Sequence, residues 1–230
     1  MRLYAKIPHL PGSRVGPAER FAPAPLVARM VAEARDGDRV IVSEKLDGTC
    51  VAIVATDAGI EARGRDGAPC ALSRNDGRRA FAAWVQARAA RFAAVLAPGE
   101  RLMIEWLALA HGTRYALPHG PAVAIDGFTD AVRWPLAETI ARATAARLPI
   151  ATVLHDGGAL PVDEADARLG VHGHHGAIDA AEGVMYRLER GDEVVVLAKR
   201  VRPTKRDGIY LADHSGADHV WNSWHDEATP

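Results

Sequence analysis

The sequence predicts an α+β fold, and two features of its hydrophobic pattern support this prediction. Apolar and β-branched runs come in neighbouring pairs joined by short turns, as in antiparallel sheets. Stretches whose apolar residues recur at helical intervals are separate from these pairs, whereas a parallel α/β chain would alternate strand and helix. We expect one domain over residues 1–230, with an extended N-terminal segment at 1–25 and a C-terminal tail at 212–230.

The expected elements follow from local residue preferences. The first 25 residues are rich in proline and glycine, which favours an extended or looped segment. Pro98 and Gly99 would end one helix, and Pro135 would occupy the first turn of another. Helical spacing predicts helices at 26–35, 78–96 and 135–147. Apolar, β-branched runs predict strands at 39–43, 50–56, 60–65, 101–109, 122–128, near 150–154, and at 182–189 and 193–202.

Composition narrows the class of protein. Hydrophobic residues make up 48% and charged residues 25% of the chain, which is ordinary for a soluble globular protein. No apolar run is long enough to span a bilayer and no secretory signal is recognisable, so we expect no membrane partner. Cys50 and Cys70 match neither a disulfide framework nor a metal-ligand pattern, and a reducing cytoplasm is the expected location.

The charge balance does not by itself indicate a nucleic-acid-binding protein, because the formal net charge is -1. Arginine-rich stretches at 63–65, 74–79 and 199–206 could still form a local basic face, since phosphate contacts need only a few placed cations. The alternative is that each stretch is an ordinary solvated surface.

The local feature most suggestive of chemistry is the segment from Glu44 to Thr49, which places Lys45 between a predicted buried strand and a glycine turn. A lysine amine attacks only after losing its proton, and burial or nearby cations favour that loss. Asp47 alone would oppose it, so this segment makes chemical sense beside a metal ion or other cations. Alternatively, Lys45 is a surface lysine beside an ordinary turn.

Five further segments occur downstream in a recognisable order. They are Gly64–Gly67 (GRDG), Met103–Trp106 (MIEW), Ala124–Phe128 (AIDGF), Glu182–Met185 (EGVM) and Leu197–Pro203 (LAKRVRP). Together with Lys45-Leu46-Asp47-Gly48-Thr49, they resemble the motifs of the covalent nucleotidyltransferase superfamily, and most closely those of ATP-dependent RNA ligases. The resemblance runs from about residue 38 to 211. The opening Lys6–Ser13 (KIPHLPGS) is similar to the start of bacterial RNA ligase domains.

This resemblance implies a role for each matching residue on the nucleotide side. Lys45 would be the nucleophile that becomes adenylylated, with Asp47 and Lys199 as further catalytic residues and Lys199 neutralising the α-phosphate. Glu182 would hold a metal ion, directly or through water. Glu105 would accept a hydrogen bond from a ribose hydroxyl. The backbone around Glu44, with Ile125 and Phe128, would contact the adenine.

On the nucleic-acid side, the resemblance implies that Arg65 contacts ribose or a strand phosphate, and that Arg202 and Lys205 bind phosphates. Arg63 competes with Arg65, because alternate strand residues point to the same face. Ordinary structural roles in strands or turns remain open for Glu105, Glu182, Lys199 and Arg202. The histidine cluster from His172 to His175 could hold a metal ion, touch RNA or be a flexible loop.

The resemblance also implies a fold, a reaction and partners. The fold would be the ligase adenylation (nucleotidyltransferase) fold, with two mainly antiparallel sheets and flanking helices. ATP and Mg²⁺ or Mn²⁺ would be required, and RNA with 5′-phosphate and 3′-hydroxyl ends would be joined, with an end-healing kinase-phosphatase as a conceivable partner. We expect no OB-fold, because the 28 residues after Arg202 are too few for that barrel.

Three positions depart from the family pattern, and two other functions stay open. Cys50 stands where many phage-type RNA ligases have asparagine, Ile125 where an aromatic often stacks on adenine, and Val201 where a second lysine is usual. These departures leave the sealing step less supported than adenylylation. The alternatives are a minimal DNA ligase or capping-type nucleotidyltransferase, and a non-catalytic RNA-end-binding module.

Overall fold

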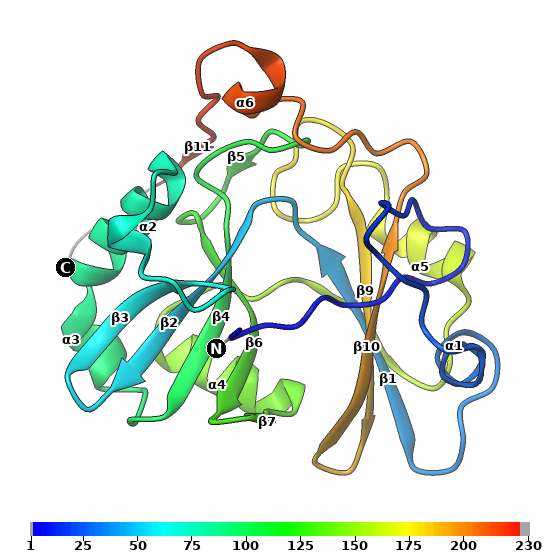
Figure 1. Ribbon diagram of the computed structural model, residues 1–230. Helices are drawn as coiled ribbons and strands as arrows, with labels where there is room; N and C mark the ends of the chain where they lie inside the picture. Colours follow the sequence, from blue (N-terminus) through cyan, green and yellow to red (C-terminus); the bar gives the residue numbers. More distant parts are fainter. Residues whose placement is uncertain (1, 226–230) are drawn as a thin grey trace.

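The computed structural model describes residues 2–225 and consists of two antiparallel sheets that face each other, with helices on their outer faces (Figure 1). This arrangement confirms the predicted α+β class. Side chains of both inner faces line a shared cavity, whereas the outer faces pack against helices.

The four-stranded sheet has the order β10-β9-β1-β8. Its outer face carries Val40, Val42 and Tyr186, which are fully buried with α1 and α5. Because strand side chains alternate, Ile41, Ser43 and Lys45 point the other way and line the cavity. The bounds are α1 Ala24–Val31, β1 Asp38–Lys45, β8 Val153–Gly157, α5 Val162–Leu169, β9 Gly183–Arg190 and β10 Glu193–Val201.

The five-stranded sheet has the order β3-β2-β4-β6-β7. Its outer face buries Val51, Ile53 and Ile104 against helices α2, α3 and α4. Trp84 and Trp106 extend this core, with ring centroids 5.7 Å apart. The bounds are β2 Thr49–Thr56, β3 Gly59–Gly64, α2 Asp76–Gln86, α3 Ala89–Ala93, β4 Glu100–Trp106, β6 Ala122–Thr129, β7 Val132–Arg133 and α4 Leu136–Ala145.

Smaller elements complete the described chain. Strands β5 (Ala116–Leu117) and β11 (Ser223–Trp224) form a short parallel pair that ties the C-terminal segment to the loop after β4. A 3-10 turn (η1, Cys70–Leu72) and a four-residue helix (α6, Ala212–Ser215) are also present. In the described part of the chain, no helix has the length and apolar character needed to cross a membrane.

The chain passes from one sheet to the other immediately after Lys45. Strand β1 ends at Lys45 and β2 begins at Thr49, so the three residues between them span the gap between the sheets. Gly48 is required there, because a Cβ at this position would lie 2.5 Å from the Trp106 carbonyl oxygen. Lys45, which the sequence predicted as the nucleophile, therefore lies at the junction of the two sheets.

The N-terminal segment runs across both sheets before reaching α1 (Figure 1). At one end, the N–H groups of Leu3 and Tyr4 donate to the Arg65 carbonyl oxygen, beyond the end of β3. Further along, Pro8 and Leu10 exchange backbone hydrogen bonds with Lys199 of β10. This segment thus belongs to the cavity wall.

The structure differs from the predicted elements in several places, including the following three. The helix expected at 78–96 is two helices, and the break lies beside Trp84, on which Arg88 stacks at 4.6 Å. The strand expected at 101–109 ends at Trp106, because the Leu107 N–H donates to Pro121 and later residues join the C-terminal segment. Helix α5 was not predicted; it is short, and three of its eight residues are acidic.

A buried ion pair joins the sheets. Arg187 of β9 donates to Oδ1 of Asp126 on β6 at 2.7 Å, and the Asp126 side chain is fully buried. Arg133 of β7 lies 2.8 Å from the other carboxylate oxygen.

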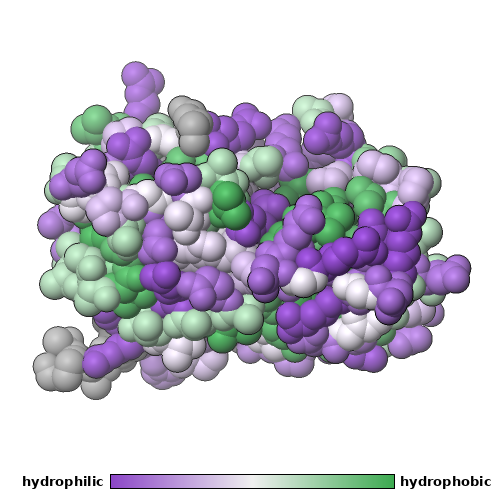
Figure 2. Space-filling view, turned by 90° about the horizontal axis from the view of Figure 1, so that it is seen from below, coloured by the Kyte–Doolittle hydropathy of each residue, from purple (hydrophilic) through white to green (hydrophobic). Residues whose placement is uncertain are grey.

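On the face seen from below, hydrophilic side chains predominate and hydrophobic ones form smaller patches between them (Figure 2).

Candidate active site

A cavity of about 460 Å³ lies between the two sheets. Lys45, Glu182 and Lys199 line it from the four-stranded side, and Glu105 lines it from the five-stranded side. Its volume is in the usual range for small-molecule sites, and it combines apolar walls with a few converging charged groups. Four motifs separated along the chain therefore meet around one space.

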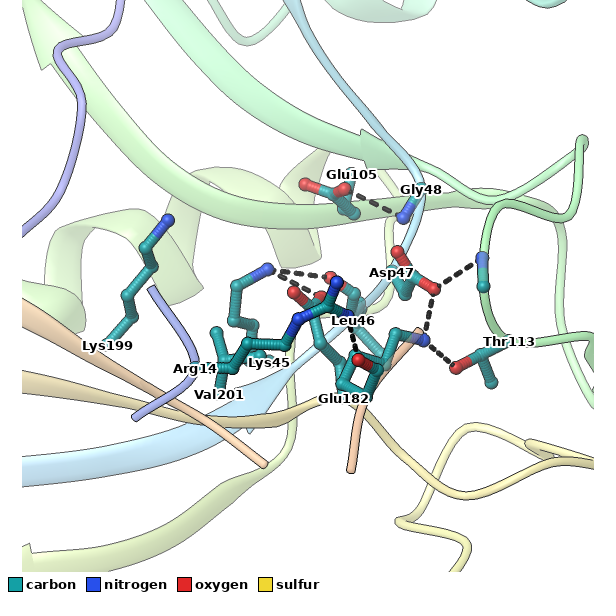
Figure 3. Close-up of polar contacts among 12 residues, drawn as sticks. Arg14, Lys45, Leu46, Asp47, Gly48, Glu105, Thr113, Glu182, Lys199 and Val201 are labelled. Atoms are coloured by element: carbon teal, nitrogen blue, oxygen red, sulfur yellow. Dashed lines mark hydrogen bonds and ion pairs between the residues drawn. The ribbon is translucent and has the colours of Figure 1, made fainter. Parts of the chain in front are cut away.

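Lys45 is paired with Glu182 in this cavity (Figure 3). The Lys45 Nζ lies 2.6 Å from the Glu182 carboxylate, and strand register explains the contact, because Lys45 on β1 is opposite Gly183 on β9. Burial lowers the pKa of the Lys45 amine, but the carboxylates of Glu182, Glu105 and Asp47 outweigh burial and raise it. Without a ligand, Lys45 is therefore an ammonium ion at neutral pH.

The carboxylates around Lys45 are also perturbed. Burial raises the pKa of Glu105 to about 7, with Lys45 opposing and Glu182 adding to the rise. Burial likewise raises the pKa of Glu182, against the attraction of Lys45. Glu105 also accepts a hydrogen bond from the Gly48 N–H at 2.9 Å, which fixes it beside the segment that joins the sheets. Such a crowded set of buried acids around one lysine favours an added cation.

Asp47 points away from Lys45 (Figure 3) and forms an ion pair with Lys205. The Lys205 ammonium donates to Asp47 and to the Thr113 hydroxyl, and the Gly112 N–H donates to Asp47 at 2.8 Å. Lys205 is only 7% exposed, so its charge is used inside the protein. The expected contact of Lys205 with RNA phosphate does not match this position.

Glu44 is held by the histidine-rich loop. Its carboxylate accepts the His174 N–H at 2.7 Å, and its Oε1 is buried with no hydrogen-bond partner among the described residues. Gly173 has a φ of +62°, and a Cβ there would lie 2.1 Å from Glu44 Oε1, so only glycine fits. Burial raises the pKa of Glu44, with the His174 N–H opposing.

The histidines themselves do not gather as a metal site. Within residues 2–225, no group of three or more histidine, cysteine or acidic side chains is arranged to hold a metal ion. His175 is buried and bonds to His119 at 2.8 Å and to the Thr152 hydroxyl at 3.1 Å. The loop therefore supports Glu44 and the junction with β8. A divalent metal ion would therefore have to be bound in the way that is common for Mg²⁺. One or two carboxylates, such as Glu182, would supply part of the ligands, and water and phosphate oxygens the rest.

The apolar part of the cavity wall is mostly aliphatic, with Tyr4 of the N-terminal segment as an aromatic member. Ile125 lines it from β6, whereas Phe128, three residues along, does not. Phe128 packs edge-on against Tyr4, with centroids 6.0 Å apart, and Arg101 stacks over it at 4.2 Å. The remaining apolar lining residues include Ile41, Ile150, Met185 and Leu197.

The two arginines predicted to bind nucleic acid are placed differently. Arg65 lines the cavity, and its guanidinium makes no hydrogen bond or ion pair within residues 2–225. Arg202 lies outside the cavity lining and donates to the carbonyl oxygens of Gly170 and Val171. Arg63, the competitor of Arg65, pairs with Glu61 and does not line this cavity.

Sequence reasoning did not single out several polar side chains that line the cavity, among them Arg78 and His111. Arg78 comes from α2, and His111 lies 3.1 Å from the Thr49 hydroxyl. The arginine-rich stretch at 74–79 was a signal for the first. No sequence signal indicated His111, because it and its partner Thr49 are 62 residues apart in the sequence.

Solved structures share this fold. An archaeal ATP-dependent RNA ligase aligns with 86% of this chain and 48% of its own, at 17% identity and a TM-score of 0.51. A Naegleria gruberi RNA ligase mutant solved with ATP and manganese aligns over 78% and 52%, at 14% identity and 0.53. The same organism's RNA ligase with pyrophosphate aligns over 94% and 63%, at 13% identity and 0.53. The chain thus spans between about half and just under two thirds of these proteins.

The two facing antiparallel sheets and the cavity between them define the nucleotidyltransferase fold of RNA ligases. The sequence model of the RNA ligase family matches residues 38–205, well over half of the chain. The chain belongs to the RNA ligase family. A search of curated proteins found no significant match.

Proposed function

We propose that this protein is an ATP-dependent RNA ligase in which Lys45 carries AMP. The observation that supports this most is the position of Lys45. It ends β1, faces a cavity large enough for a nucleotide, and has Glu182 at 2.6 Å and Glu105 nearby on the opposite sheet. Membership of the RNA ligase family supports the same proposal.

The proposed reaction has three phosphoryl-transfer steps. The neutral Lys45 amine attacks the α-phosphorus of ATP, a nitrogen–phosphorus bond forms, and the bond to pyrophosphate breaks. A 5′-phosphate oxygen of the RNA then attacks the same phosphorus and releases Lys45. Finally a 3′-hydroxyl attacks the 5′-phosphorus, loses its proton, and AMP leaves. Positioning and charge neutralisation supply most of the catalysis in such reactions.

The cavity residues suit these steps. The apolar wall with Ile125 would pack against adenine, and the backbone around Glu44, which lines the cavity, would contact the edge of the base. Glu105 would accept a ribose hydroxyl, and Lys199 would neutralise the α-phosphate. A divalent metal near Glu182 would offset the carboxylate charge that keeps Lys45 protonated.

RNA is the proposed nucleic acid, with a 5′-phosphate at one end and a 3′-hydroxyl at the other. Arg65 is the side chain best placed to contact the incoming strand, because it lines the cavity and makes no ion pair within residues 2–225. A kinase-phosphatase that heals RNA ends and a cytoplasmic location fit this activity.

The test is covalent labelling. The purified protein is incubated with α-labelled ATP, GTP or labelled NAD and a divalent metal, and is then denatured and run on a gel. We expect label from ATP alone, none on Lys45→Ala, and full labelling of the control Lys6→Ala, whose lysine is exposed. Labelled protein is then offered 5′-phosphorylated nicked RNA and DNA duplexes.

Sealing of RNA in preference to DNA is the expected outcome. Preferred sealing of DNA would indicate a minimal DNA ligase, and labelling by GTP would indicate a capping-type enzyme. Binding of RNA ends without any labelled lysine would leave a non-catalytic end-binding module and refute the mechanism.

A further inference from the structure

The N-terminal KIPHLPGS motif reaches the cavity at Lys199. The Lys199 N–H donates to the Pro8 carbonyl oxygen at 2.9 Å, and the Leu10 N–H donates to the Lys199 carbonyl oxygen at 2.8 Å. Residues 8–10 therefore lie alongside β10 as an additional extended strand. The backbone of Lys199 is held by a segment almost 190 residues earlier in the sequence.

A carboxylate from the same segment holds the Lys199 side chain. The Lys199 Nζ lies 2.6 Å from Oε1 of Glu19, and Oε2 of Glu19 lies 2.8 Å from Nε2 of His9. The Gly16 N–H also donates to Oε2, at 3.2 Å. Burial raises the pKa of Glu19, but the hydrogen bonds from Lys199 and Gly16 lower it to about 2, so the carboxylate is ionised.

His9 in turn is fixed by Ser13. His9 is 1% exposed, and its Nδ1 lies 2.7 Å from the Ser13 hydroxyl. The Val201 N–H donates to the same hydroxyl oxygen at 2.8 Å, and the hydroxyl hydrogen points at Nδ1, which at 2.7 Å is a much closer acceptor than the Arg14 carbonyl oxygen at 3.5 Å. His9 then carries its hydrogen on Nε2 and donates it to Glu19. Burial, with Lys199, lowers the pKa of His9 and supports this neutral form.

From this network we infer that Glu19 and His9 are positioning residues for Lys199. A lysine side chain has four rotatable bonds and one mobile charge, so a fixed carboxylate is needed to hold its ammonium group in one place. The requirement is sharper here, because Val201 stands where a second lysine is usual in the family, and Lys199 acts without that neighbour. The inference rests on the proposed function, in which Lys199 neutralises the α-phosphate.

The test measures single-turnover adenylylation of Lys45 as a function of ATP concentration. Glu19→Gln keeps the shape of the side chain and removes its charge. We expect the maximal rate to fall about tenfold, because a misplaced charge affects the transition state most, while the ATP concentration for half-maximal rate changes less than about threefold. The matched control is Glu164→Gln. Glu164 is an exposed carboxylate on α5 whose ion pair with Arg168 is long, at 3.9 Å, so this variant should behave as wild type.

A pair of His9 variants separates positioning from a merely structural effect. His9→Gln retains an N–H that can donate to Glu19 and should keep most of the rate, whereas His9→Leu should lose as much as Glu19→Gln. Thermal melts identify any variant that has lost its fold. Both His9 variants replace a buried ring, so equal losses in the two would overturn the inference.

The remaining outcomes are also decisive. A wild-type rate in folded Glu19→Gln would overturn the positioning role. A faster rate would overturn it too, since the carboxylate would then compete with phosphate for Lys199. If the wild-type protein itself takes no label from ATP, the proposed function fails, and that result is distinguishable from failure of the Glu19 inference.

Discussion

The two sheets present different chemistry to the same cavity. On the four-stranded side, both lysines already have carboxylate partners, Lys45 with Glu182 and Lys199 with Glu19, each at 2.6 Å. On the five-stranded side, Glu105 accepts a hydrogen bond from the Gly48 N–H, and Arg65 has no ion-pair partner within residues 2–225. Under the proposed function, this difference assigns the α-phosphate chemistry to the side whose lysines are already paired, and contact with the RNA strand to the side that carries Arg65.

The division requires that the sheets stay in register, and Arg187 is the side chain that ties them. Arg187→Met should lower the free energy of unfolding by about 3 kcal/mol, because it leaves the fully buried Asp126 with one cation fewer. Urea unfolding at pH 7 measures this. Arg168→Met, on the exposed face of α5, is the control and should change stability by less than about 0.5 kcal/mol. A loss below about 1 kcal/mol would show that apolar packing alone aligns the sheets.

Removing the charge from the four-stranded side should cost most of the chemistry. Glu182→Gln should lower the rate of Lys45 adenylylation about 100-fold, since it deletes both the partner of Lys45 and the carboxylate proposed to hold a metal ion. Gel labelling with ATP measures the rate. Glu193→Gln, exposed at the start of β10, is the matched control. Labelling within about threefold of wild type would remove Glu182 from the chemistry.

Removing charge from the five-stranded side should leave adenylylation intact and impair transfer to RNA. Arg65→Ala should slow transfer of AMP from Lys45 to a 5′-phosphate about tenfold, because a charge-assisted phosphate contact is lost. The measurement starts from protein already adenylylated. Arg63→Ala is the internal control, because Arg63 pairs with Glu61 and lies outside this cavity. Equal effects of the two variants would contradict the assignment of Arg65.

Local patterns predicted most of the strands, and the order of short motifs predicted which of them would meet. Lys45 and Glu182 are 137 residues apart, yet their contact follows from antiparallel register between β1 and β9. Contacts made by loops gave no comparable signal. The sequence predicted Lys205 as a phosphate-binding cation, whereas in the structure it is buried and paired with Asp47. Glu19 lies in a segment whose proline and glycine content predicts only an extended path.

Phe128 shows a second limit of sequence patterns. Strand alternation indicates which face a residue occupies, but not what covers it. Tyr4, from the N-terminal segment, fills the space in front of Phe128 and separates it from the cavity lining. A contact between residues more than 120 positions apart depends on tertiary packing that no local pattern encodes.

A second, more exposed ion pair should stabilise the fold less than the buried pair of Arg187 and Asp126 does. Arg114, in the loop after β4, donates to Asp179, before β9, at 2.9 Å. The hydrogen bond from Arg114 lowers the pKa of Asp179 to about 2, with burial opposing. A depressed pKa means that this carboxylate stabilises the fold above its ordinary pKa of about 4 and loses that contribution as pH falls toward 2.

Asp179→Asn should therefore lower the free energy of unfolding by about 1 kcal/mol at pH 7, a value reduced by solvent screening because both side chains of the pair are partly exposed. The difference from wild type should shrink between about pH 4 and pH 2, where the wild-type carboxylate takes up its proton. Urea unfolding at several pH values measures it. A constant difference across this range would mean that the asparagine disturbs the loop by shape. No difference from wild type at any pH, including pH 7, would mean that the pair of Arg114 and Asp179 does not stabilise the fold.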